Sequence, residues 1–117
     1  MSKLGPNVKS HVTKSQRAAL HQVMTALGAA PAGSTDRFEK FDLGGTSIGF
    51  EIVDDARAWS TEEARAKGTW LEIVVADPAA TRDKLAELGV TPFEFVDPSH
   101  DYFQLPGGQV FRTAAEG

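Results

Sequence analysis

Two stretches of the chain carry the same hydrophobic pattern. Between Gln16 and Leu27, apolar side chains recur at the spacing of one helix face, at Leu20, Val23, Met24 and Leu27. Gly28 follows where a helix often ends in a left-handed conformation. A second Leu-Gly pair closes another helical pattern at Gly89, 61 residues further on. The chain therefore repeats one plan of secondary structure.

Short apolar runs around these helices predict the strands. In the first half we expect strands at Asn7–Thr13, Arg37–Leu43 and Thr46–Val53, the last two joined as a hairpin by a double glycine. In the second half we expect strands at Trp70–Val75, Thr91–Val96, Asp101–Leu105 and Gln109–Thr113.

Polar residues mark the helix ends and the connection between the halves. Ser15 is the expected N-cap of the first helix, and Asp77-Pro78 is the expected start of the second. The charged connection contains a possible helical turn at Thr61–Ala66. It also contains Trp59, a large apolar residue that we expect to cover a pocket mouth or a partner subunit.

The repeat predicts an α+β fold in which two βαβββ modules pair. We place module 1 at about 1–55, the linker at about 56–68 and module 2 at about 69–117. Module 1 lacks a clear second strand, because Ala29–Asp36 consists largely of loop-forming residues. A single module cannot hide its inner face from water, so we expect both to form one half-open barrel around a cleft. A chain of 117 residues fits one such domain.

Composition narrows the classes of function. A net charge of −4 argues against a nucleic-acid partner, because phosphate binding requires clustered Lys and Arg. The absence of cysteine excludes disulfides and thiolate chemistry and fits a cytoplasmic location. The sequence contains no apolar run of membrane-spanning length and no secretory signal pattern, so we expect no membrane association.

Two segments resemble a known superfamily. They are Val74–Val90, with its Asp-Pro helix start and Leu-Gly-Val end, and Phe41–Glu51, with its Gly-Gly hairpin. These segments and the order of elements resemble the vicinal oxygen chelate superfamily. It includes glyoxalase I, fosfomycin resistance proteins, extradiol dioxygenases and bleomycin resistance proteins. The resemblance covers nearly the whole chain and implies the fold, but the superfamily contains both metalloenzymes and metal-free binding proteins.

The resemblance also implies where a metal would be held. In the superfamily's metalloenzymes, side chains of four inner strands bind a divalent ion, and the corresponding positions here are Lys9, Gly49, Trp70 and Arg112. Tryptophan has no lone pair to donate, and arginine stays protonated. We therefore expect no metal at these positions and no other cofactor.

A site shifted by two residues is the alternative. His11, Glu51 and Glu72 lie two residues further along three of these strands, on the same faces. If they face one cavity, they provide an imidazole and two carboxylates, which suit a divalent metal. The protein would then be a metal-dependent lyase, isomerase or transferase. The simpler interpretation is that Glu51 and Glu72 point outward, as solvated charges on their strands.

The first choice is a metal-independent, small-molecule binding protein of the bleomycin-resistance type. Its ligand is expected in the cleft between the modules, in contact with His11, Glu51, Trp70, Glu72 and Arg112. We expect a homodimer, because the weak first module leaves a strand edge to be covered. The sequence leaves open whether the protein is an enzyme.

Overall fold

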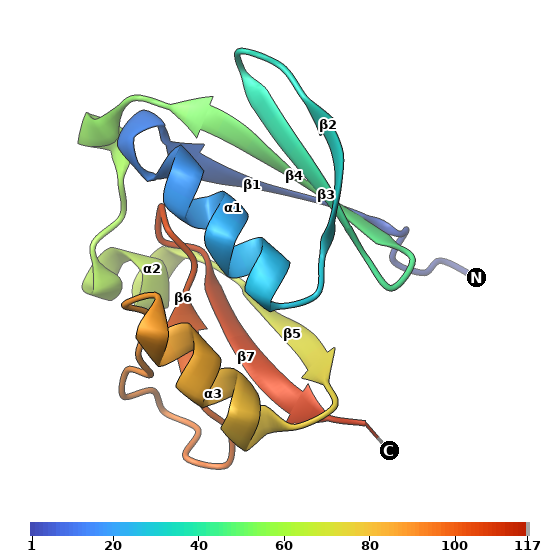
Figure 1. Cartoon of the computed structure of the whole chain (residues 1–117), viewed down its shortest axis with the longest axis vertical. Coiled ribbons are helices and arrows are strands. Elements are labelled where there is room, and N and C mark those ends of the chain that lie inside the picture. Colours follow the sequence, from blue (N-terminus) through green and yellow to red (C-terminus); the bar gives the residue numbers. More distant parts are fainter. Residues whose placement is uncertain (117) are drawn as a thin grey trace.

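The computed structural model describes residues 1–116 and contains two β-sheets with α-helices packed on them (Figure 1). Module 1 contains β1 (Asn7–Thr13), α1 (Arg17–Ala26), β2 (Ala30–Ser34), β3 (Phe38–Leu43) and β4 (Thr46–Val53). The connection carries α2 (Thr61–Lys67). Module 2 contains β5 (Trp70–Val75), α3 (Pro78–Glu87), β6 (Tyr102–Gln104) and β7 (Val110–Ala115).

Each module places its first strand beside its last. Sheet 1 has the order β1-β4-β3-β2 and sheet 2 the order β5-β7-β6. The pairs β1–β4 and β5–β7 are parallel, and the remaining pairs are antiparallel. The mixed α+β fold with two unclosed sheets is therefore confirmed, and both sheets follow one plan.

The prediction of which module is incomplete was wrong. Ala30–Ser34 forms the edge strand β2, which pairs with β3 around a bulge between Pro31 and Gly33. All five β2 residues are exposed, so the strand is held by backbone hydrogen bonds and leaves no hydrophobic pattern in the sequence. In module 2, the predicted strand at Thr91–Val96 is reduced to one bridge between Phe93 and Tyr102.

Phe93 and Phe95 explain why that strand does not form. Both side chains pack with Ala64 of α2 and with Tyr102 in a small apolar cluster. The alternating pattern that predicted a strand therefore reflects contacts with the connection, which covers part of sheet 2.

The two main helices begin differently. Asp77 caps α3 as predicted, since its Oδ1 accepts hydrogen bonds from the backbone N–H groups of Ala79 and Ala80 at 3.1 and 3.2 Å. The predicted cap of α1 was wrong. A 3₁₀ turn at Lys14–Gln16 precedes α1, and the backbone N–H of Ser15 donates to Asp55 instead. No helix in the described part of the chain is long and apolar enough to cross a membrane.

One hydrophobic core joins the two modules. The predicted helix stripe is buried, and α1 and α3 lie side by side over the sheets (Figure 1). The core also takes side chains from one face of each sheet, among them Phe41, Phe50, Ile73 and Phe111. The opposite face of each sheet points away from α1 and α3, and we call it the open face.

Candidate functional site

The open face of sheet 2 brings three of the predicted site residues together. Trp70 and Glu72 are on β5, and the register places Arg112 of β7 opposite Glu72. The guanidinium of Arg112 lies over the Trp70 ring, 4.2 Å from its centroid. Its Nη2 is 2.6 Å from Glu72 Oε2, and its Nε donates to the same oxygen at 2.9 Å. Arg112 therefore holds a fixed position between a carboxylate and an indole.

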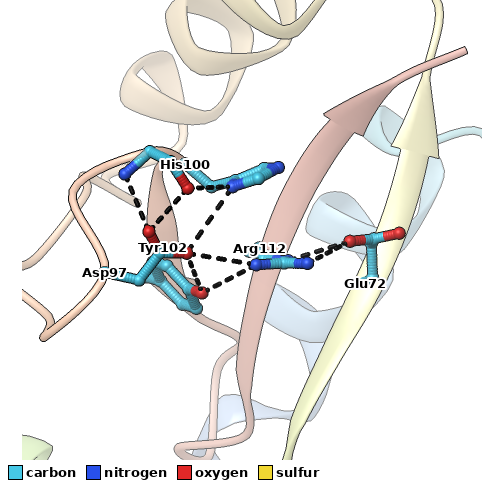
Figure 2. A network of polar contacts seen from close by, with 6 residues as sticks. Glu72, Asp97, His100, Tyr102 and Arg112 are labelled. Atoms are coloured by element: carbon cyan, nitrogen blue, oxygen red, sulfur yellow. Dashed lines mark hydrogen bonds and ion pairs between the residues drawn. The ribbon is translucent and has the colours of Figure 1, made fainter.

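A second carboxylate contacts Arg112 from the other side (Figure 2). Arg112 Nη1 lies 3.1 Å from Asp97 Oδ2 and donates to the hydroxyl of Tyr102 at 3.1 Å. That hydroxyl donates to Asp97 Oδ2 at 2.9 Å, while His100 Nδ1 is 3.6 Å from the same oxygen. We call Glu72, Asp97, Tyr102 and Arg112 the Arg112 network.

Hydrogen bonds and burial determine the charges in this network. Hydrogen bonds from Ser99, and then from Tyr102, hold the pKa of Asp97 far below its usual range. Burial raises the pKa of Tyr102, and the hydrogen bond to Asp97 adds to this rise. Since Glu72 and Asp97 both face one guanidinium, Arg112 is already neutralised. The network is therefore better suited to orienting a ligand than to capturing a free anion.

The open face of sheet 1 carries the other two predicted residues. Glu51 accepts a hydrogen bond from Lys9 at 2.7 Å, and this hydrogen bond lowers the pKa of Glu51. His11 is the register partner of Glu51, and its ring meets Trp59 edge-on at 5.1 Å. His11 Nε2 is buried and has no hydrogen-bond partner among residues 1–116.

The described residues do not assemble a metal centre. Within residues 1–116, no group of three or more His, Asp or Glu side chains is placed to hold an ion. His11 and Glu51 are neighbours on paired strands, but Glu51 is held by Lys9 and Glu72 by Arg112. The ring of Phe38 covers Gly49, where an added Cβ would meet it at 2.2 Å.

Trp59 covers part of its own chain. A Cβ on Gly68 or Gly108 would lie 2.9 or 3.2 Å from Trp59 atoms, so the side chain packs closely on both. It therefore shields His11 and the β6–β7 turn, and it also borders a shallow pocket beside that turn. Sequence reasoning missed Asp97 and His100 as members of a network, because both stand in an Asp-Pro-Ser-His turn that needs no further explanation. The alternation of Tyr102 and Phe103 along one strand is the signal that could have added Tyr102 to the predicted site.

The fold is shared with solved structures of low sequence identity. FosX, a fosfomycin resistance protein from Listeria monocytogenes, is 15% identical with a TM-score of 0.71, covering 100% of this chain and 93% of that chain. A glyoxalase family protein from Enterococcus faecalis is 17% identical with a TM-score of 0.71, covering 95% and 96%. A protein from Agrobacterium tumefaciens is 18% identical with a TM-score of 0.70, covering 99% of both chains.

These likenesses confirm the expected fold, which this chain shares with fosfomycin resistance and glyoxalase family proteins. No protein-family model matches the chain, and no curated protein matches it. At such identities, chemistry has to be argued from this chain's own residues.

Proposed function

We propose that the protein is a metal-independent binding protein for a small, partly apolar molecule. The ligand lies on the open face of sheet 2 against Trp70 and the Arg112 network, at the cleft between the modules. The observation that carries this proposal is the stack of Arg112 on Trp70, whose indole remains 41% exposed. The fosfomycin resistance proteins among the similar solved structures support it, since fosfomycin is a small molecule.

The chemistry of this face favours a planar ligand. An exposed indole offers a flat apolar surface on which a ring can stack. Arg112 is held on both sides by carboxylates, so the surface is organised before a ligand arrives. Because the network holds two carboxylates for one guanidinium, we expect a neutral ligand or a hydrogen-bond donor.

A second copy of the chain is part of the same proposal. Trp70 and Val74 of β5 are 41% and 54% exposed. In the described structure, β5 is an edge strand with a sheet partner on one side only. An exposed apolar edge of this kind is usually covered. We therefore expect a homodimer with the clefts at or near the interface, and a monomer in sedimentation at micromolar concentration would contradict this.

The neutral, planar fluorophore 6-propionyl-2-(dimethylamino)naphthalene provides the test. Its emission rises when it enters an apolar site, so a titration gives an affinity. We expect the Trp70→Ala variant to bind about tenfold more weakly, because the stacking surface is lost. Trp59→Phe is the matched control, since it also removes an indole but should leave the affinity unchanged. Equal affinity of Trp70→Ala and the unaltered protein would refute the proposed site.

One observation favours the alternative of a metal-dependent lyase, isomerase or transferase. His11 Nε2 is a buried nitrogen without a partner among the described residues, next to Glu51 on the paired strand. Elemental analysis of the purified protein tests this alternative. A stoichiometric divalent metal that disappears in His11→Ala would replace the binding proposal, whereas a metal-free protein that binds the fluorophore would support it.

A further inference from the structure

A pocket lies at the seam between the modules, apart from the Trp70 and Arg112 surface. It has a volume of about 320 Å³ and is enclosed by the β3–β4 turn, β1 and β4 on one side and by β5 on the other. Its apolar lining comes from Val8, Leu43, Ile48, Leu71, Ile73 and Val74. Most of these residues belong to the helix-facing sides of the two sheets, which contribute to the core. Trp70 and Arg112 do not line it.

The equivalent place in the other module is filled. There the β6–β7 turn lies directly on β1, so that a Cβ on Gly107 would come within 2.8 Å of Val12 Cα. Gln109 completes this contact, because it accepts a hydrogen bond from Ser10 and donates one to the carbonyl of Thr69, each at 2.8 Å. The chain itself therefore closes one of two related seams.

The seam beside the β3–β4 turn stays open. A Cβ added to Gly44 or Gly45 would meet nothing within 4 Å. Both glycines have positive φ values, +54° and +93°, which fix the path of the tight turn. The floor is fixed as well, since Ile48 and Ile73 are almost fully buried in their sheets. The shape of the pocket is thus fixed by the turn of module 1 and by buried residues of both sheets.

We propose that this pocket binds a compact, uncharged and mainly aliphatic molecule. Only two polar side chains line it, Thr46 and Glu72. The Glu72 carboxylate is already bonded to Arg112, which leaves the Thr46 hydroxyl as a hydrogen-bonding group. An anionic ligand would lie beside the Glu72 carboxylate without a counter-ion, and any charged ligand would lose hydration against the apolar walls. The volume is at the lower end of the range of small-molecule sites, about 300–1,000 Å³.

Methyl NMR spectroscopy with cyclohexanol as the probe tests this site. Cyclohexanol is compact, so its hydroxyl group has to enter the pocket together with the ring carbons. We expect saturable shifts of the Val8, Ile48, Leu71 and Ile73 methyl signals at about millimolar probe concentration. Cyclohexylammonium and cyclohexanecarboxylate should bind at least about tenfold more weakly, because each loses hydration against apolar walls, and Glu72 also repels the carboxylate.

Two variants control the experiment. Val8→Phe fills the pocket and should abolish the shifts, while Val96→Phe adds the same ring at a residue that is 82% exposed and should preserve them. If Val8→Phe does not fold, Leu71→Phe fills the pocket from the opposite wall. Unchanged binding by a folded, filled variant would overturn the proposal, as would shifts centred on residues around Trp70.

Dilution of the protein distinguishes a small-molecule site from a contact surface for a second copy of the chain. The homodimer proposed above would cover the exposed β5 side chains Trp70 and Val74, so this control uses the opposite wall of the pocket. Without a probe, the Val8 and Ile48 methyl signals should not depend on protein concentration. Concentration-dependent shifts at both residues would assign the pocket to a subunit interface and would refute a small-molecule site. This outcome is independent of the fluorophore titration, because Trp59 and Trp70 do not line this pocket.

Discussion

Each module pairs a carboxylate with a basic side chain of its helix, but in different surroundings. In module 1, Glu39 of β3 accepts hydrogen bonds from Arg17 at 2.7 Å and contacts His21 at 2.9 Å. In module 2, Asp101 stands at the matching place before β6 and is 3.5 Å from Arg82 of α3. The Glu39 side chain is only 5% exposed, whereas Asp101 and Arg82 are 35% and 52% exposed. Burial, more than the pairing itself, gives such a contact its weight in stability.

The hairpin turns of the two modules also differ in how closely they are packed. The β6–β7 turn is packed on the neighbouring module and the β3–β4 turn is not, although both contain a double glycine. Beyond the shared core, module 1 therefore has a buried polar contact of its own, and the hairpin turn of module 2 packs on module 1. The predictions below test this difference, beginning with the largest effect.

Gly107→Ala should be the most destabilising substitution. Gly107 has a φ of +99°, and its new Cβ would meet the backbone of Val12 at 2.8 Å. Backbone strain and overpacking together should lower the free energy of unfolding by about 4 kcal/mol. Gly44→Ala has a φ of +54° and open space around it, so we expect a loss of about 1 kcal/mol. Urea denaturation of both variants measures the difference, and equal losses would show that the seam is not packed.

Glu39→Gln should have the next largest effect. It removes the charge that neutralises Arg17 in a buried position, which should cost about 3 kcal/mol. Asp101→Asn, the matched change in module 2, should cost about 0.5 kcal/mol or less, because its pair is open to solvent. The same urea experiment checks both, and a loss in Asp101→Asn as large as that in Glu39→Gln would contradict the role given to burial.

The pH dependence of stability should follow Glu39. Burial raises the pKa of Glu39, but hydrogen bonds from Arg17, His21 and Ser34 outweigh burial, so the pKa lies below its ordinary value of 4.5. A carboxyl with a lowered pKa in the folded state stabilises the protein above its unfolded-state pKa. That stabilisation is lost as the pH falls below about 4.5 and through the folded-state pKa. Urea midpoints should therefore fall less steeply below this pH in Glu39→Gln than in the unaltered protein.

The sequence predicted those elements whose stability depends on buried side chains. Spacing located α1 and β5, and an Asp-Pro pair located the start of α3, because each of these signals is a local arrangement of residues. The strand β2 escaped prediction since its pairing is made by backbone groups and its side chains are exposed. The segment Thr91–Val96 has the hydrophobic alternation of a strand but forms only one bridge. Its apolar side chains Phe93 and Phe95 pack with α2 instead.

The candidate site shows a similar limit. The family resemblance placed Trp70 and Arg112 on inner strands, the two-residue period of strands added Glu72, and the register brings the three together. Asp97 joins them from a loop whose path no local pattern specifies. The partner of Glu51 was also unpredictable, because an ion pair between strands depends on register.

Asp77→Ala should have a smaller effect, on α3 alone. It removes the cap that accepts hydrogen bonds from Ala79 and Ala80, at a cost of about 1 kcal/mol. Ser15→Ala is the matched change near α1, where the side chain caps nothing, so the free energy of unfolding should stay within about 0.5 kcal/mol. Thermal or urea unfolding tests the pair. A comparable loss in Ser15→Ala would mean that α1 is capped by its hydroxyl after all.

The smallest expected effect is spectroscopic and concerns the Arg112 network. Tyr102 is the only tyrosine in the sequence, so phenolate absorbance reports on this residue alone. Burial raises its pKa above 10.0, the hydrogen bond from Arg112 lowers it and the hydrogen bond to Asp97 raises it. Asp97→Asn should therefore shift the absorbance titration to lower pH, and Arg112→Met should shift it to higher pH. Shifts of the same sign in both variants would show that Tyr102 does not share hydrogen bonds with the two residues at once.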